Sequence, residues 1–306
     1  MAVASSRAPS KQARGPRGDG LLAAIFIAPA MAGFLVFLLW PTLRGIYLSF
    51  TRYNLLTPAE WVGLDNYRRM VNDPIFWGSL RVTVEYVVIN IGVQTVAALC
   101  IAVLMQRLTT SSLLRGVVLT PYLVSNVVAG VVFLWILDTQ LGIGNEILGA
   151  LGFDHVAFLA SNEWVIPSVA LINVWRHVGY TALLLFAGLQ AIPGDVYEAA
   201  RVDGAGKVRI FFQLSLPMAS APLITLGVLT YITAWNDYFW PLMVSYSDSS
   251  RVLTVALSIF RSQTPQSGTD WAGLMAATLI AALPMLVLFG VFARRIVNSI
   301  GFSGLK

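Results

Sequence analysis

The chain has 306 residues, of which 57% are hydrophobic and 11% charged, and its mean hydropathy is +0.73. Soluble domains carry about 25% charged residues, so this composition excludes a soluble enzyme or binding module and indicates a membrane protein. The net charge of +5 comes from dispersed bases, which excludes nucleic acid as a partner because a nucleic-acid surface gathers its bases into one patch.

Apolar runs of about twenty residues recur along the chain, the length that crosses a bilayer as a helix. We therefore predict an all-α, polytopic membrane fold with about six transmembrane helices in one domain, 21–296. The predicted spans are 21–40, 80–105, 116–137, 165–187, 218–238 and 271–293. Basic segment 1–20 precedes them and 297–306 follows. Since no small-residue cleavage site follows the first run, we interpret it as an uncleaved helix.

The basic residues predict the orientation in the membrane. On this map twelve of the 20 Lys and Arg residues lie on the side of the termini and seven on the other side, while Arg176 falls within a span. Loop 138–164 carries four acidic residues and neither Lys nor Arg. Because cytoplasmic loops are enriched in Lys and Arg, both termini are expected in the cytoplasm.

Three polar side chains of the third and fourth spans are candidates for a solute pathway. Asn126 lies in the third span, and Arg176 and Tyr180 lie in the fourth. A charged or amide group at membrane depth is costly unless it has a use. Metal ligation is not expected, because the chain has one cysteine, Cys100, and two histidines in different regions.

The segment 188–217 between the fourth and fifth spans is unusually polar and reads, in part, "EAARVDGAGKVRIFFQLSLP". Pro193 and Gly194 predict a helix start just before Glu198, and the Gly204–Gly206 interruption predicts a turn before a second helix. Ile210, Phe211 and Phe212 are expected to rest on the membrane domain. Small residues then leave a surface that another protein can approach closely. The alternative interpretation is a solvated loop that only joins two spans.

The "GAGK" of this segment is not a nucleotide-binding loop. That loop needs a glycine five places before Gly206 and Ser or Thr after Lys207, and the chain has Arg201 and Val208 there. We therefore expect no cofactor, and any energy source must come from a partner or a gradient.

The fifth span ends in a cluster of aromatic and polar residues, Trp235, Asn236 and Asp237, followed by Tyr238. An aromatic ring beside a carboxylate or amide is typical of a sugar-binding surface, which adds these three residues to the pathway candidates. The alternative is an interfacial belt, because Trp and Tyr collect at membrane boundaries.

The polar segment resembles the coupling motif of binding-protein-dependent ABC importer permeases. The resemblance rests on Glu-Ala-Ala, three residues, Gly, nine residues, an aliphatic residue, any residue and Leu-Pro. The matching residues are Glu198, Ala199, Ala200, Asp203, Gly204, Leu214, Leu216 and Pro217. "WPTLRGIYLSFTRYN" (40–54), "WVGLDNY" (61–67) and "LTPYLVSNVVAGVVFLWIL" (119–137) are similar to the sugar-type members, the maltose and glycerol-3-phosphate permeases. The first half of the chain resembles one permease of such pairs and the second half the other, which leaves its position in the pair open.

The resemblance implies a transmembrane permease subunit in a bacterial inner or plasma membrane, with no enzymatic activity of its own. It implies three protein partners: a second permease, cytoplasmic ATP-binding subunits that bind the ATP, and an extracytoplasmic solute-binding protein. The implied solute is a sugar, a polyol or a phosphorylated derivative. The residues leave two alternatives, a secondary transporter, which normally shows an internal repeat, and a membrane-embedded enzyme.

Overall fold

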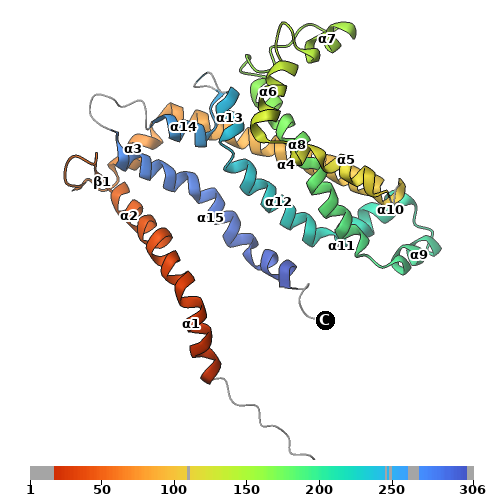
Figure 1. Cartoon of the computed structure of the whole chain (residues 1–306), viewed down its shortest axis with the longest axis horizontal. Coiled ribbons are helices and arrows are strands. Elements are labelled where there is room, and N and C mark those ends of the chain that lie inside the picture. The colour runs from red at the N-terminus through yellow and green to blue at the C-terminus, as the bar shows by residue number, and fades with distance from the viewer. Residues whose placement is uncertain (1–16, 109–110, 245–246, 248–249, 261–268, 302–306) are drawn as a thin grey trace, which may run out of the picture.

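The computed structural model describes residues 17–108, 111–244, 247, 250–260 and 269–301. These residues are helical almost throughout (Figure 1), which confirms the all-α prediction. The helical elements are α1 (Arg17–Phe34), the π-helical turn η1 (Leu35–Leu39), α2 (Trp40–Ser49), α3 (Asp65–Val71), α4 (Pro74–Leu108), α5 (Ser112–Leu123), α6 (Asn126–Ile136), α7 (Ile143–Ala150), α8 (Val165–Gln190), α9 (Gly194–Val202), α10 (Lys207–Ile210), the π-helical turn η2 (Phe211–Ser215), α11 (Leu216–Met218), α12 (Ser220–Trp235), α13 (Phe239–Val244), α14 (Leu253–Phe260) and α15 (Trp271–Gly301).

Four helices are long and apolar enough to cross a membrane, and two bent helix pairs raise the number to six if each pair is one span. The four helices are Leu22–Ser49, Pro74–Gln106, Val165–Gln190 and Trp271–Ala293. They coincide with the first, second, fourth and sixth predicted spans. Residues 1–16 of the predicted N-terminal tail and 302–306 of the C-terminal tail lie outside the described residues.

The first span is longer than predicted, because the helix continues through Trp40 and Pro41 to Ser49. Pro41 stands in the first turn of α2, and a proline is compatible with a helix where its missing amide hydrogen is not needed. The helix ends at a corner, where β1 (Thr51–Arg52) pairs antiparallel with β2 (Glu60–Trp61).

The third and fifth predicted spans are each broken. Helices α5 and α6 meet at an angle of 88°, and the segments Lys207–Met218 and Pro222–Trp235 meet at 70°. Val124 and Ser125 have extended backbone between α5 and α6, and Ser125 is a residue type favoured at a helix N-cap.

The core is the contact between α4 and α8, the two most extensively packed helices. Ala98, Ala102 and Ala182 are fully buried in it, and small side chains allow helices to approach closely in a membrane. A buried hydrogen bond crosses the same contact, in which Gln94 Nε2 donates to Thr181 Oγ1 over 2.8 Å.

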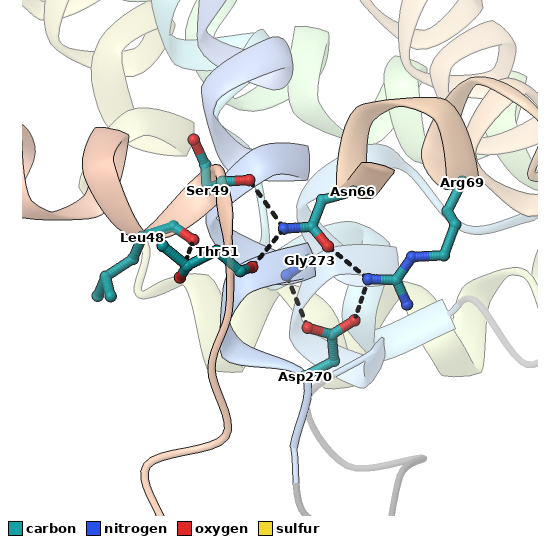
Figure 2. A network of polar contacts seen from close by, with 7 residues as sticks. All are labelled: Leu48, Ser49, Thr51, Asn66, Arg69, Asp270 and Gly273. Atoms are coloured by element: carbon teal, nitrogen blue, oxygen red, sulfur yellow. Dashed lines mark hydrogen bonds and ion pairs between the residues drawn. The ribbon is translucent and has the colours of Figure 1, made fainter. Parts of the chain in front are cut away.

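A polar network fastens the end of the first span to α3 and α15 (Figure 2). Buried Asn66 donates from Nδ2 to the carbonyl oxygens of Ser49 and Thr51, each over 2.8 Å. Arg69 donates to Asn66 Oδ1 and forms an ion pair of 3.2 Å with Asp270 at the start of α15. We call these residues the corner network.

In Figure 1 the start of α1 lies at the bottom of the view, α9 and α10 lie at its right edge, and α7 lies at its top. Loop 138–164, which contains α7, thus lies well away from α9 and α10.

Candidate functional site

The polar segment forms a helix, a tight turn and a second helix, as predicted. Helix α9 ends at Val202, and Gly204, two residues further on, has a φ of +77°. The Ala205 amide donates to Ala200 O over 2.9 Å and the Gly204 amide to Arg201 O over 3.0 Å, the pairing of a Schellman cap with glycine at its left-handed position. Gly204 therefore has a conformational reason to be glycine, because other residues are strained in this region.

The matched residues of this segment form an exposed surface. Glu198, Ala199, Asp203 and Gly204 are exposed, and Ala200 is half-buried. Two apolar side chains beside them are also exposed, Val202 at 87% and Val208 at 71%.

A hollow of about 520 Å³ lies between α9, α10 and the end of α4. Glu198, Arg201 and Lys207 all line it, together with Tyr197 and Ser215. The segment thus offers a recess lined by three charged side chains.

The remainder of the segment runs along the membrane domain. Leu216 is half-buried and Pro217 is exposed, in the first turn of α11. Ile210 is buried, as predicted. The prediction for Phe212 is wrong: its side chain is 59% exposed, because it lies on the opposite side of the helical turn from buried Ile210.

A second site surrounds the Asp237 carboxylate, between α12 and α13. Asp237 Oδ2 accepts a hydrogen bond of 2.6 Å from the Tyr86 hydroxyl of α4 and one of 3.0 Å from Asn173 Nδ2 of α8. His177 contacts the Asn173 carbonyl oxygen through Nδ1 over 2.9 Å. We call Tyr86, Asn173, His177 and Asp237 the polar cluster; it joins three membrane helices at a carboxylate.

Arg176 and Tyr180 lie beside the polar cluster on α8. The Arg176 Nε atom is buried, with no hydrogen-bond partner among the described residues. The Tyr180 ring stacks on Tyr122 of α5, with centroids 4.8 Å apart, and Tyr122 contacts His177 edge-on. Tyr180 thus faces α5, and Arg176 lies one helical turn before it on α8.

Asn126 begins α6 at the break between α5 and α6. Its Oδ1 atom is buried and has no hydrogen-bond partner among the described residues. An acceptor at a broken membrane helix is where transporters commonly present polar groups.

The other two candidates face elsewhere. Trp235 is buried at 7% exposure, and its Nε1 donates to the Ala281 carbonyl oxygen of α15 over 3.0 Å. Asn236 is exposed and donates to the Ile232 carbonyl oxygen of its own helix. Both side chains bond to backbone, away from Asp237.

The sequence prediction missed Tyr86 and Asn173, the direct partners of Asp237. Both are polar residues inside predicted spans, so polarity at membrane depth was a signal for them as well. Their pairing with Asp237 was not readable, since Tyr86 stands 151 residues away. None of the described residues form a group of three or more His, Cys, Asp or Glu side chains that would hold a metal ion.

Comparison with known proteins decides the family. The model of the binding-protein-dependent transport system inner membrane component family matches residues 94–301. The chain belongs to this family. It is therefore a membrane permease of an ABC transporter, and it is not an enzyme.

Three relatives extend this result over most of the chain. The sulfoquinovosyl glycerol transport system permease protein SmoG of Agrobacterium fabrum is 32% identical, over 88% of this chain and 89% of its own. The trehalose/maltose transport system permease protein MalF of Thermococcus litoralis is 32% identical, over 71% of this chain and 74% of the MalF chain. The sn-glycerol-3-phosphate transport system permease protein UgpA of Pectobacterium atrosepticum is 30% identical, over 70% of this chain and 73% of the UgpA chain.

The fold agrees with a solved permease. A chain in the crystal structure of a bacterial alginate ABC transporter, in complex with its alginate-pentasaccharide-bound periplasmic protein, superposes with a TM-score of 0.75 at 21% identity. The match covers 92% of this permease and 96% of that chain. The secondary-transporter and membrane-enzyme alternatives are not favoured.

Proposed function

We infer that this permease forms, with a second permease, the pathway by which a sugar, a polyol or a phosphorylated derivative enters the cell. The relatives support the solute class, since their names refer to a sulfoquinovosyl glycerol, to trehalose and maltose, and to glycerol 3-phosphate. An extracytoplasmic solute-binding protein delivers the solute. ATP is bound and hydrolysed by partner subunits in the cytoplasm, on the side of both termini.

The α9 surface docks against an ATP-binding subunit. The observation that carries this assignment is the exposed cap at Gly204 beside a recess lined by Glu198. Ala199, Ala200 and Asp203 complete the contact, and Leu216 and Pro217 link it to α12. Helices α9 and α10 lead through η2 and α11 into α12, the helix that precedes Asp237. A movement of the ATP-binding subunit would therefore be passed to α12 by a rigid-body displacement of α9 and α10.

The polar cluster and its neighbours line the solute pathway. The Asp237 carboxylate accepts hydrogen bonds from solute hydroxyls in exchange for those from Tyr86 and Asn173. The Arg176 guanidinium offers a fixed fork of donors for a hydroxyl or a phosphate. Asn126 and Tyr180 border the same space, while Trp235 and Asn236 hold the end of α12 in place.

Reconstituted vesicles test the docking assignment. Glu198→Arg places the wrong charge in the recess, and Gly204→Trp adds bulk to the docking surface, so co-purification of the ATP-binding subunit and solute uptake should both fall. Gly152→Trp is the matched control, because Gly152 also has a left-handed φ, +82°, and open space around its Cβ position, but lies in loop 138–164. Equal retention of the ATP-binding subunit by the Gly204 and Gly152 variants would leave α9 as a mere connection.

Two further variants test the pathway assignment. Asp237→Asn and Arg176→Lys should lower uptake while the complex still assembles and the isolated binding protein still binds solute. A phosphorylated solute makes Arg176 the more sensitive position, and a neutral sugar makes Asp237 the more sensitive. Normal uptake in both variants would place the solute elsewhere.

A further inference from the structure

A groove of about 770 Å³ lies between α2 and loop 53–59, at the end of the first span. Trp40, Arg44 and Tyr47 line its helical side, and the loop supplies mostly apolar walls, including Leu55 and Leu56. Arg44 is the one charged residue among those that line the groove, all of which lie in the described part of the chain.

The position of Arg44 corresponds to the boundary of the bilayer. No Asp, Glu, Lys or Arg occurs between Gly20 and Leu43, and a helix needs about 20 residues to cross the hydrocarbon layer. Trp40 and Tyr47 stand four residues before and three after Arg44, so all three share one helix face. Trp and Tyr on such a face are typical of the head-group region.

Loop 53–59 has a backbone conformation that exposes Leu55 and Leu56. Asn54 Oδ1 accepts hydrogen bonds from the amides of Leu56 and Thr57 and from the Thr57 hydroxyl, over 2.9 to 3.1 Å. Leu55 adopts a φ of +68°, which is costly for a residue with a Cβ. Leu56 is 83% exposed. Exposed leucines beside a bilayer are stabilised where acyl chains surround them.

Arg44 differs from its neighbour Arg52 in its electrostatic surroundings. Arg52 forms an ion pair of 3.8 Å with Glu60, whereas Arg44 has no ion-pair partner among the described residues. A guanidinium matches a phosphate with two parallel hydrogen bonds. The groove thus pairs one cation with apolar walls at head-group depth.

We propose that this groove binds a phospholipid of the leaflet at the β1 end of the first span, with the phosphate on Arg44 and an acyl chain against Leu55 and Leu56. The site holds the end of the first span at a fixed depth. The corner network stabilises the backbone between α2 and β1, because Asn66 donates hydrogen bonds to the carbonyl groups of Ser49 and Thr51. Lipid bound here is a component of the permease, separate from the solute pathway at Asp237.

Native mass spectrometry of the delipidated, purified transporter complex tests the proposal with three probes: phosphatidylglycerol, diacylglycerol and inorganic phosphate. Arg44→Gln should weaken phosphatidylglycerol binding about tenfold, the loss expected for a hydrogen-bonded charge, and leave diacylglycerol binding unchanged. Arg52→Gln is the matched control, because it removes the same charge eight residues away from Arg44. This variant should bind phosphatidylglycerol as tightly as the unaltered protein does.

A second variant separates folding from binding. Leu55→Gly relieves the left-handed strain at this position and removes an apolar wall, so the complex should remain folded and bind phosphatidylglycerol more weakly. Three results would overturn the proposal: unchanged phosphatidylglycerol binding by Arg44→Gln, an equal loss in Arg52→Gln, or inorganic phosphate competing as well as the lipid, which would indicate a site for free phosphate.

Discussion

Substitution of Gly179 by alanine is expected to force two membrane helices apart. Gly179 lies in α8, where a Cβ atom would stand 1.9 Å from the Val118 carbonyl oxygen of α5 and 3.2 Å from Val118 Cγ1. A carbon and a carbonyl oxygen in contact are normally about 3.3 Å apart. The obstacle is backbone, which no rotamer change removes, so the helices must separate locally by about 1.4 Å.

The cost follows from two opposing terms. Overpacking of this kind costs about 3 kcal/mol, and replacing a helical glycine by alanine returns up to about 1 kcal/mol. Gly179→Ala should therefore destabilise the permease by about 2 kcal/mol. It should also disturb the Tyr122–Tyr180 stack, since these rings join the same two helices, and solute uptake should fall.

Gly116→Ala is the matched control, because Gly116 lies in α5 and has open space around its Cβ position. Thermal unfolding of the purified complex, followed by tryptophan fluorescence, should show a lower midpoint for Gly179→Ala and an unchanged or higher midpoint for Gly116→Ala. Equal midpoints for the two variants would refute the close approach of α5 and α8.

Three more predictions concern the corner network, loop 138–164 and the orientation in the membrane. Asn66→Ala should destabilise the protein by about 2 kcal/mol or more, because it leaves two carbonyl groups of the corner network unpaired; a thermal midpoint equal to that of the unaltered protein would contradict this. The Leu141 and Gln140 amides donate to the Asp138 carboxylate and lower its pKa. The stability that these hydrogen bonds add is fully present above the pKa of about 3.9 of an unfolded aspartate. It is lost only as the pH falls through the lower pKa of the folded state. Amide exchange in this turn should thus be equally protected at about pH 7 and about pH 5, and lost protection at the lower pH would refute the assignment. In intact cells an impermeant thiol reagent should label Glu146→Cys and not Lys207→Cys, and labelling at Lys207 would reverse the orientation.

The apolar runs of the sequence located the four candidate membrane helices and the two bent pairs of the described residues, since length and composition decide which segments cross a bilayer. They did not locate the ends of the first span or the breaks in the third and fifth. The first helix continues to Ser49 because polar residues beyond Trp40 still form helix at the membrane surface. The break before Asn126 could not be predicted from the sequence, because α5 and α6 are both apolar and hydropathy carries no information on the direction of a helix axis.

The candidate sites were predictable where the information is local. The cap at Gly204 follows from glycine between two helical stretches, and the structure adds the hydrogen bonds that require it. The partners of Asp237 come from helices distant in sequence, so pattern alone did not supply them. Accessibility was also not readable: Asn145, in the acidic loop, is buried at 1% exposure and bonds to Val156, so Glu146 is the suitable position for labelling.

Photo-crosslinking from α9 tests most directly whether this surface docks an ATP-binding subunit. Val202 ends α9 and Leu141 lies just before α7. They are a matched pair, because both are apolar and 87% exposed. A photoreactive residue at position 202 should form an adduct with the ATP-binding subunit of the assembled transporter, identified by mass spectrometry, and one at position 141 should not. The absence of that adduct at position 202, or its appearance at position 141, would contradict the proposed coupling of this permease to ATP hydrolysis.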